Sequence, residues 1–254
     1  MTDNLEEEDG LNIGTYVGER NDAGERSGLG FNTYPNGDTY VGMYLNGMRN
    51  GKGLYTWKKG GLYEGEYVNH KRNGFGILHY PDGAVYEGLW ENNWRNGVGT
   101  YTYPNGDVYE GEWQWGRRHG HGIYKVKKDG SIFDGEFRRG RRHGIVKWIL
   151  PNGYVFVGVF QNDQQLGRGK WVSTASGLAV HGEYARIDKE EGEGEEGPTE
   201  EEEQIEEEDL DELIEPEEQR PTKVATVWMP DFGIHHDFDE LNTTPSWHLH
   251  GAEE

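Results

Sequence analysis

Residues 63–83 read YEGEYVNHKRNGFGILHYPDG, and this stretch decides the fold. It contains two short segments of alternating character, residues 63–67 and 74–80, joined by a polar link and closed by a proline turn at 81–83. Side chains in a strand alternate between two faces, so the aromatic residues and the glycine of the first segment share a face that excludes its two glutamates. The stretch therefore predicts a β-hairpin of two short strands.

This pattern recurs seven times along the chain, with 23 or 24 residues between successive copies. Three glycine positions return with it: one two residues after the opening aromatic, one Gly-x-Gly pair, and one three residues before the next aromatic. A partial eighth copy begins at Val180 with His181-Gly182-Glu183-Tyr184. Such regular self-similarity is typical of repeat proteins whose neighbouring units stack to form one core. The opening aromatics are Tyr16, Tyr40, Tyr63, Tyr86, Tyr109, Phe133 and Phe156.

Tandem hairpins of this kind predict an all-β fold, a single elongated and twisted antiparallel sheet. Seven repeats give fourteen strands, which at roughly 4.8 Å each form a ribbon on the order of 65 Å long. Glycine inside a strand weakens it, but a large ring lying over a neighbouring glycine restores the packing. We therefore expect the aromatics of one strand to cover the glycines of the next. Closing turns such as Tyr34-Pro35-Asn36-Gly37 predict a type I turn followed by a left-handed glycine.

Charge divides the chain into four regions. The formal net charge is −22, but residues 16–186 are slightly basic, so the acidity belongs to the ends. We expect an acidic stub at 1–15, the repeat ribbon at 16–186, an acidic linker at 187–219, and a tail at 220–254 with docking segments. So acidic a chain should repel nucleic acid. With no cysteine, no leader-like apolar run and no spanning segment, we expect an intracellular protein.

The acidic region and the tail carry separate expectations. From Asp188 to Glu218 there are 19 acids and one lysine, a density that favours an unfolded chain. An alternative is a short helix with Ile205, Leu210, Leu213 and Ile214 on one stripe. Beyond it, residues 221–230 are apolar and β-prone around Trp228. These are either terminal residues without a role or a docking strand that pairs with the edge of a partner.

The repeat resembles the MORN family, and Tyr86-Glu87-Gly88-Leu89-Trp90 through Arg95-Asn96-Gly97-Val98-Gly99 is a good instance. The resemblance covers residues 16 to about 184 and implies the ribbon fold. The order of acidic stub, seven uninterrupted repeats, glutamate run and tryptophan segment is similar to that of MORN proteins of the axonemal radial spoke head. That likeness implies a structural scaffold in the cytoplasm, at the axoneme of motile cilia and flagella, that supports dynein-driven motility. Its partners would be other radial spoke head proteins. The chain departs from the pattern at Val146 and after Glu218.

Motifs that carry chemistry are weak here. Residues 192–197 satisfy the dinucleotide pattern G-x-G-x-x-G, but they follow no strand and are rich in carboxylates that would repel a pyrophosphate. His119, His121 and His143 stand beside arginines, and adjacent positive charge opposes a metal site. No nucleophile, base and acid occur in a supporting context. We therefore expect no enzyme activity, no cofactor and no metal.

One charged cluster stands out, because links of adjacent repeats should stack and align its arginines along one ribbon edge. It has three interpretations: a solvated edge, a surface for an acidic partner or this chain's own tail, and a site for anionic lipid headgroups. The last supports an alternative function, a phosphoinositide-binding adaptor at a membrane surface, although an anionic membrane would repel the acidic tail. A second copy of this chain, in a homodimer, is a further candidate partner. The candidate partner-binding residues are Arg117, Arg118, Arg138, Arg139, Arg141, Arg142 and Trp228.

Overall fold

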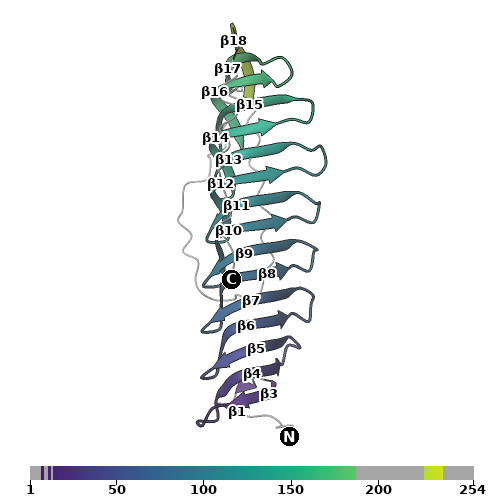
Figure 1. Cartoon of the computed structure of the whole chain (residues 1–254), viewed down its shortest axis with the longest axis vertical. Coiled ribbons are helices and arrows are strands. Elements are labelled where there is room, and N and C mark those ends of the chain that lie inside the picture. The colour runs from purple at the N-terminus through teal and green to yellow at the C-terminus, as the bar shows by residue number, and fades with distance from the viewer. Residues whose placement is uncertain (1–6, 9–10, 13, 187–225, 237–254) are drawn as a thin grey trace, which may run out of the picture.

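The computed structural model describes residues 7–8, 11–12, 14–186 and 226–236, and it confirms the predicted ribbon. Sixteen strands form one antiparallel sheet in chain order, stacked from β3 to β18 (Figure 1). This is two strands more than the fourteen predicted, because β17 and β18 form an eighth hairpin. A separate pair, β1 (Glu7–Glu8) and β2 (Leu11–Asn12), precedes the ribbon. The ribbon strands are β3 (Thr15–Arg20), β4 (Arg26–Thr33), β5 (Thr39–Leu45), β6 (Met48–Thr56), β7 (Leu62–Val68), β8 (Lys71–His79), β9 (Val85–Glu91), β10 (Trp94–Thr102), β11 (Val108–Gln114), β12 (Arg117–Lys125), β13 (Ile132–Arg138), β14 (Arg141–Ile149), β15 (Tyr154–Gln161), β16 (Gln164–Ser173), β17 (Leu178–Arg186) and β18 (Thr226–His236).

The opening tyrosine of each of the first five repeats covers two glycines, as predicted. Gly65 of β7 lies directly opposite Gly76 of β8, and the ring of Tyr63 lies over both. The Tyr63 hydroxyl donates a hydrogen bond to the Glu66 carbonyl at 3.2 Å. Burial raises the pKa of Tyr63, so the hydroxyl stays protonated as a donor. The same bond to the carbonyl three residues on recurs for Tyr16, Tyr40, Tyr86 and Tyr109.

These rings also contact one another from repeat to repeat. Tyr63 makes edge-to-face contacts with Tyr67 and Trp90, at centroid distances of 5.3 and 5.4 Å, and Trp90 does the same with Tyr86 at 5.2 Å. Edge-to-face geometry is favourable for aromatic quadrupoles. A sheet usually needs a second layer to bury its apolar face. Here the stacked rings bury each other, so we call this side of the sheet the aromatic face and the opposite side the open face.

Val146 interrupts the aromatic face in the sixth repeat. It replaces the glycine opposite Gly135, and its side chain is fully buried in the space that a ring occupies elsewhere. Phe133 instead stacks on Trp148, with 5.4 Å between centroids and 16° between planes. The buried residues accordingly form two clusters, one that ends at Phe137 and one around Val146, Phe156 and Phe160.

The two edges of the ribbon are closed by different turns. At one edge the proline turns have the predicted form: the Gly37 N–H donates to the Tyr34 carbonyl, and Gly37 has a φ of 89°. Asp38 then links this turn to the next repeat, accepting hydrogen bonds from the Tyr55 hydroxyl at 2.7 Å and the Lys58 N–H at 2.9 Å. Asp107 repeats this arrangement with Tyr124 and Lys127.

At the other edge the polar links of the second to the seventh repeat are two-residue turns with positive φ at both positions. Asn92 and Asn93, for example, have φ values of 49° and 73°. This is the type I′ geometry, whose twist matches that of a hairpin. Asparagine and glycine tolerate positive φ better than other residues, which explains most of the turn residues. The turns are 46–47, 69–70, 92–93, 115–116, 139–140 and 162–163.

The last strand comes from the tail. β18 pairs antiparallel with β17, so that Arg186 lies opposite Thr226 although the whole segment 187–225 separates them in the chain. One interpretation of the sequence placed this tail segment on the edge of a partner. In the structure the edge belongs to the same chain.

Candidate functional site: the arginine ladder and the exposed arginine edge

An arginine packed against rings recurs on the aromatic face of the first six repeats, buried in the third and fourth and half-buried in the others. It lies two residues before the Gly-x-Gly pair, so strand alternation gives it the same face as those glycines. Arg95 is the clearest case: it is 7% exposed, and its guanidinium carbon lies 4.4 Å from the Trp113 ring centroid, 5.2 Å from Tyr101 and 5.7 Å from Tyr86. Cation–π attraction is strongest for such desolvated pairs. We call the set Arg26, Arg49, Arg72, Arg95, Arg118 and Arg142 the arginine ladder.

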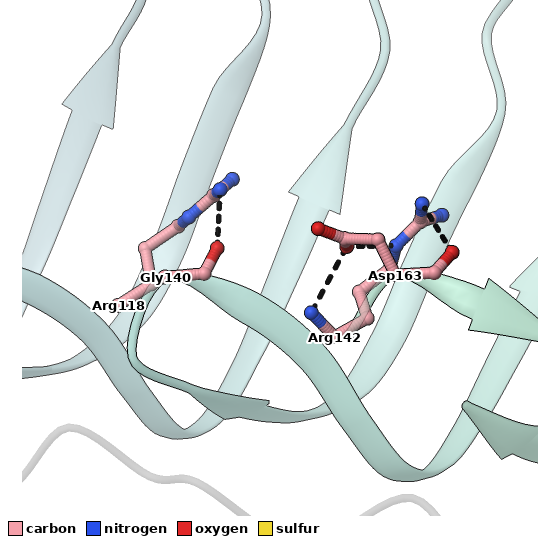
Figure 2. Close-up of polar contacts among 4 residues, drawn as sticks. All are labelled: Arg118, Gly140, Arg142 and Asp163. Carbon is pink, nitrogen blue, oxygen red and sulfur yellow. Dashed lines mark hydrogen bonds and ion pairs between the residues drawn. The ribbon is translucent and has the colours of Figure 1, made fainter. Parts of the chain in front are cut away.

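Each ladder arginine from Arg49 onward also fastens the turn of the following repeat. The Arg95 guanidinium donates to the Gly116 carbonyl at 2.6 Å, and the Gly116 N–H donates back to the Arg95 carbonyl at 3.0 Å. Figure 2 shows the guanidinium bond for Arg118, which reaches Gly140, and for Arg142, which reaches Asp163. These arginines therefore join their own strand, the rings of their repeat and the next turn.

The ladder changes at the C-terminal end of the ribbon. In the seventh repeat Gln165 takes the arginine position, opposite Phe160. In the eighth hairpin Trp228 takes it, opposite Tyr184. The Trp228 ring lies over Gly182, and its centroid is 4.9 Å from that of Tyr184 and 6.0 Å from that of Phe156. The ring of Trp228 thus takes the last position of the row that arginines form in the first six repeats.

His70, in the turn at 69–70, makes the stability of the ribbon depend on pH. His70 Nδ1 accepts a hydrogen bond from the Arg49 N–H at 3.2 Å, the contact that Asn93 makes with Arg72 in the next repeat. Desolvation and the charges of Arg49 and Arg26 lower the pKa of His70. In the pH window between this lowered pKa and the ordinary value near 6.5, the unfolded chain binds more protons than the folded one. Stability is therefore lost as pH falls below about 6.5.

We expect the His70→Asn variant to lose this pH dependence while the turn is kept. Between pH 7.5 and 5 the wild type should lose more stability than the variant, by under about 0.5 kcal/mol because His70 is exposed and water screens the charges. Urea unfolding at several pH values measures the difference. Parallel pH profiles for the two proteins would show that His70 does not titrate as described.

The six arginines selected from the sequence belong to two different surfaces. Arg118 and Arg142 are ladder residues on the aromatic face, packed on rings and half-buried, so they are not an exposed binding edge. Arg117, Arg138 and Arg139 are exposed around the turns of the fifth and sixth repeats. Arg141 is half-buried and lies directly opposite Arg138. We call Arg117, Arg138, Arg139 and Arg141 the arginine edge.

A shallow groove lies beside the arginine edge. His119, His121, Glu136, Arg138 and His143 line it, and its volume is about 480 Å³. His121 Nε2 lies 2.9 Å from an Asp134 carboxylate oxygen. Within the described part of the chain no three His, Cys, Asp or Glu residues form a group that could hold a metal ion. The exposed arginines beside this open groove suit an anionic group on a partner better than they suit a small substrate.

One row of side chains on the open face is apolar toward the N-terminal end. Val17, Phe31, Val41 and Leu54 lie side by side across β3 to β6, and each is at least 36% exposed. The next position in this row is Glu64, and further carboxylates follow it along the ribbon. The ribbon thus offers chemically different surfaces at different points along its length.

Other sequence features lie outside the described residues. These are the glycine pattern at 192–197, the stripe from Ile205 to Ile214 and the acidic linker at 187–219. Residues 14–186 and the short described segments contain no helix long and apolar enough to cross a membrane.

A single-layer ribbon of stacked hairpins with several open surfaces defines a repeat protein, a class in which neighbouring units share one core. The family model for the MORN repeat matches residues 23–39, 40–62, 63–85, 86–108, 109–125 and 133–153. The chain belongs to the MORN-repeat family. Five of these matches begin at the second residue of a strand, namely at Tyr40, Tyr63, Tyr86, Tyr109 and Phe133.

Two curated relatives carry the name "Radial spoke head 1 homolog". The chain is 54% identical to the Mus musculus protein over 43 residues, which are 17% of this chain and 14% of that protein. It is 51% identical to the Cyprinus carpio protein over 45 residues, which are 18% of this chain and 20% of that protein. The matches thus cover a fifth or less of these relatives.

Two solved structures are similar at low TM-scores. One is the TCP domain of Drosophila melanogaster SAS-4 with a proline-rich motif of Ana2, at 15% identity and a TM-score of 0.36, covering 57% of this chain and 77% of that one. The other is a variant TCP10 domain of Danio rerio CPAP, at 17% identity and a TM-score of 0.27, covering 65% and 86%. At these scores the likeness carries no argument about function.

Proposed function

We propose that this protein is a structural scaffold of the axonemal radial spoke head in motile cilia and flagella. The observation that carries the proposal is the identity of more than half over 43 and 45 residues to two radial spoke head 1 homologs. The fold is compatible with such a role, because a ribbon held by backbone pairing and stacked rings can present partner surfaces at fixed spacing. In this role the protein binds other radial spoke head proteins and supports dynein-driven motility.

The arginine edge is the surface that we propose for one of these partners. Three exposed arginines, Arg117, Arg138 and Arg139, lie at adjacent turns, and Arg138 also lines the groove. Together they favour an acidic segment of a partner through charge-assisted hydrogen bonds. Arg118 contributes indirectly, because it holds the turn at 139–140 that carries Arg138, Arg139 and Arg141. Arg142 instead holds the following turn, at 162–163.

Charge reversal of this edge should weaken partner binding without unfolding the ribbon. We expect the triple variant Arg117→Glu, Arg138→Glu, Arg139→Glu to retain at most about a tenth of the captured partner, since each exposed contact contributes on the order of 0.5 kcal/mol and reversal adds repulsion. The matched control is Lys58→Glu, Lys59→Glu, Lys71→Glu, which changes the net charge equally at other exposed positions. Equal capture by both variants would exclude the arginine edge as the binding surface.

The function itself is tested by affinity purification of the tagged protein from motile ciliated cells, with mass spectrometry of the co-purifying proteins. We expect radial spoke head subunits to be enriched over a tagged control of similar net charge. Enrichment of membrane proteins and lipid enzymes in their place would overturn the ciliary proposal and leave the repeat fold unaffected.

A second candidate function is a phosphoinositide-binding adaptor, and the exposed arginine edge is the observation that favours it. The net charge of −22 opposes it, because anionic membranes repel the acidic regions. Co-sedimentation with phosphoinositide vesicles at physiological salt separates the two functions. Binding that survives this salt and is lost in the triple arginine variant would support the adaptor.

A further inference from the structure

The eighth hairpin is closed differently from the others. Hairpins such as β5–β6 are joined by a two-residue turn, whereas β17 and β18 are joined by the long segment 187–225. A type I′ turn forces its two strands to pair with each other. So long a connection does not, and the pairing of β17 with β18 therefore depends on the contacts between the two strands.

These contacts have one specific position. Gly182 of β17 leaves a space that the Trp228 ring fills: a Cβ built on Gly182 would lie 2.5 Å from Trp228 Cζ2. Trp228 also lies opposite Tyr184, in the register position that ladder arginines take in earlier repeats. The edge of β17 therefore selects a strand with a large aromatic residue at this position.

The rest of β18 is held less firmly. Val227 and Met229 are 46% and 50% exposed, and Pro230 has no N–H to donate. The register between the strands also shifts between Val180 and Gly182. Without β18, the β17 edge would present unpaired backbone groups, and such edges readily accept another strand.

We propose that the edge of β17 is a strand-acceptor site that exchanges β18 between two copies of this chain. In the exchanged homodimer, β18 of each copy pairs with β17 of the other, with Trp228 over Gly182 as in the single chain. The occupant is a second copy because β18 itself matches the site in register and at its aromatic position. This inference is independent of the ciliary role.

Concentration and salt set the balance between the two forms. A strand tethered to its own acceptor edge has an effective concentration on the order of millimolar, so the single chain keeps its own β18 when dilute. The connection is strongly acidic, and its ends are held at the adjacent residues Arg186 and Thr226. Repulsion between like charges favours separation of these two ends, and strand exchange permits that separation. Exchange should therefore increase with protein concentration and decrease with added salt.

The chain contains no cysteine, so pairs of introduced cysteines report strand pairing directly. Glu183 and Met229 lie opposite each other and are both exposed. The full-length Glu183→Cys and Met229→Cys variants are mixed in equal amounts and oxidised, with one of them isotopically labelled. We expect a disulfide-linked dimer of the two variants at least five times more abundant than in a control mixture of Glu183→Cys with Lys52→Cys. Its fraction should rise with concentration and fall at high salt.

The double variant Glu183→Cys, Met229→Cys shows whether the strands pair at all. If it closes within one chain while the mixture stays at the control level, β18 does not exchange and the proposal is overturned. If Trp228→Ala leaves cross-linking in the mixture unchanged, the aromatic position does not select the strand. If the Glu183→Cys variant cross-links another protein from ciliated-cell extract but not the Met229→Cys variant, the occupant is not a second copy.

Discussion

We expect the Gly76→Val variant to lose about 3 kcal/mol of unfolding free energy, at the upper end of the cost of overpacking a core. A Cβ at this position would lie 2.6 Å from Cζ of Tyr63, a distance that forces the ring to move. The ring then loses its hydroxyl bond to the Glu66 carbonyl and its edge-to-face contact with Trp90. The sixth repeat illustrates the result, since Val146 stands at the matching position and Phe133 has left its glycine to stack on Trp148.

Urea unfolding followed by tryptophan fluorescence measures this loss. Gly83→Ala in the same repeat is the matched control: Gly83 has a φ of 91° and no neighbour within 4 Å of an added Cβ, so it tests conformational cost alone, about 1 kcal/mol. The double variant Tyr63→Ala, Gly76→Val should lose less than the sum of the single losses, because the two residues share one contact. A loss below about 1 kcal/mol for Gly76→Val would show that the ring tolerates a side chain beneath it.

Removal of a ladder arginine should have the second largest effect. We expect Arg95→Met to lower the unfolding free energy by about 2 kcal/mol. A desolvated cation–π contact contributes up to about 2 kcal/mol, and a charge-assisted hydrogen bond to the Gly116 carbonyl adds a similar amount. Methionine fills much of the same space, and relief from burying a charge offsets part of the loss.

Two controls separate the contributions of charge and shape. Arg95→Lys keeps the charge but not the planar group, so most of the loss should remain. Arg117→Met removes an exposed arginine and should change stability by less than about 0.5 kcal/mol. Amide exchange at Gly116 should accelerate in Arg95→Met and not in Arg117→Met. Unchanged exchange would mean that the turn does not depend on the ladder.

Much of the fold was accessible from the sequence because its repeat is so regular. The constant repeat length, the alternation within each strand and the Gly37 turn each predict features that the structure has. The pairing of tyrosine with glycine also followed from alternation. The place of β18 could not be predicted, because local patterns carry no information about which edge a segment joins after a connection as long as 187–225.

The arginine ladder was missed although its signal was present. Arg72 has the same strand parity as Gly76 and Leu78, so alternation alone assigns it to the aromatic face. A polar link suggests exposure to solvent, and that expectation concealed an arginine that recurs once in each of the first six repeats. The burial of the Arg72 charge is explained by the ring that it packs on and by the turn carbonyl that accepts its hydrogen bond. The structure also divides the six predicted edge arginines into two groups, because Arg118 and Arg142 face the rings.

The single-layer architecture has a mechanical consequence. Strands lie across the long axis of the ribbon, so the backbone hydrogen bonds run along that axis (Figure 1). Tension between the two ends would part neighbouring strands one hairpin at a time, and each step breaks only a few bonds. Compression instead presses ring against ring and turn against turn, where close-packed atoms resist. The ribbon therefore resists compression along its long axis better than it resists tension, and it carries load best when neighbours push on its ends.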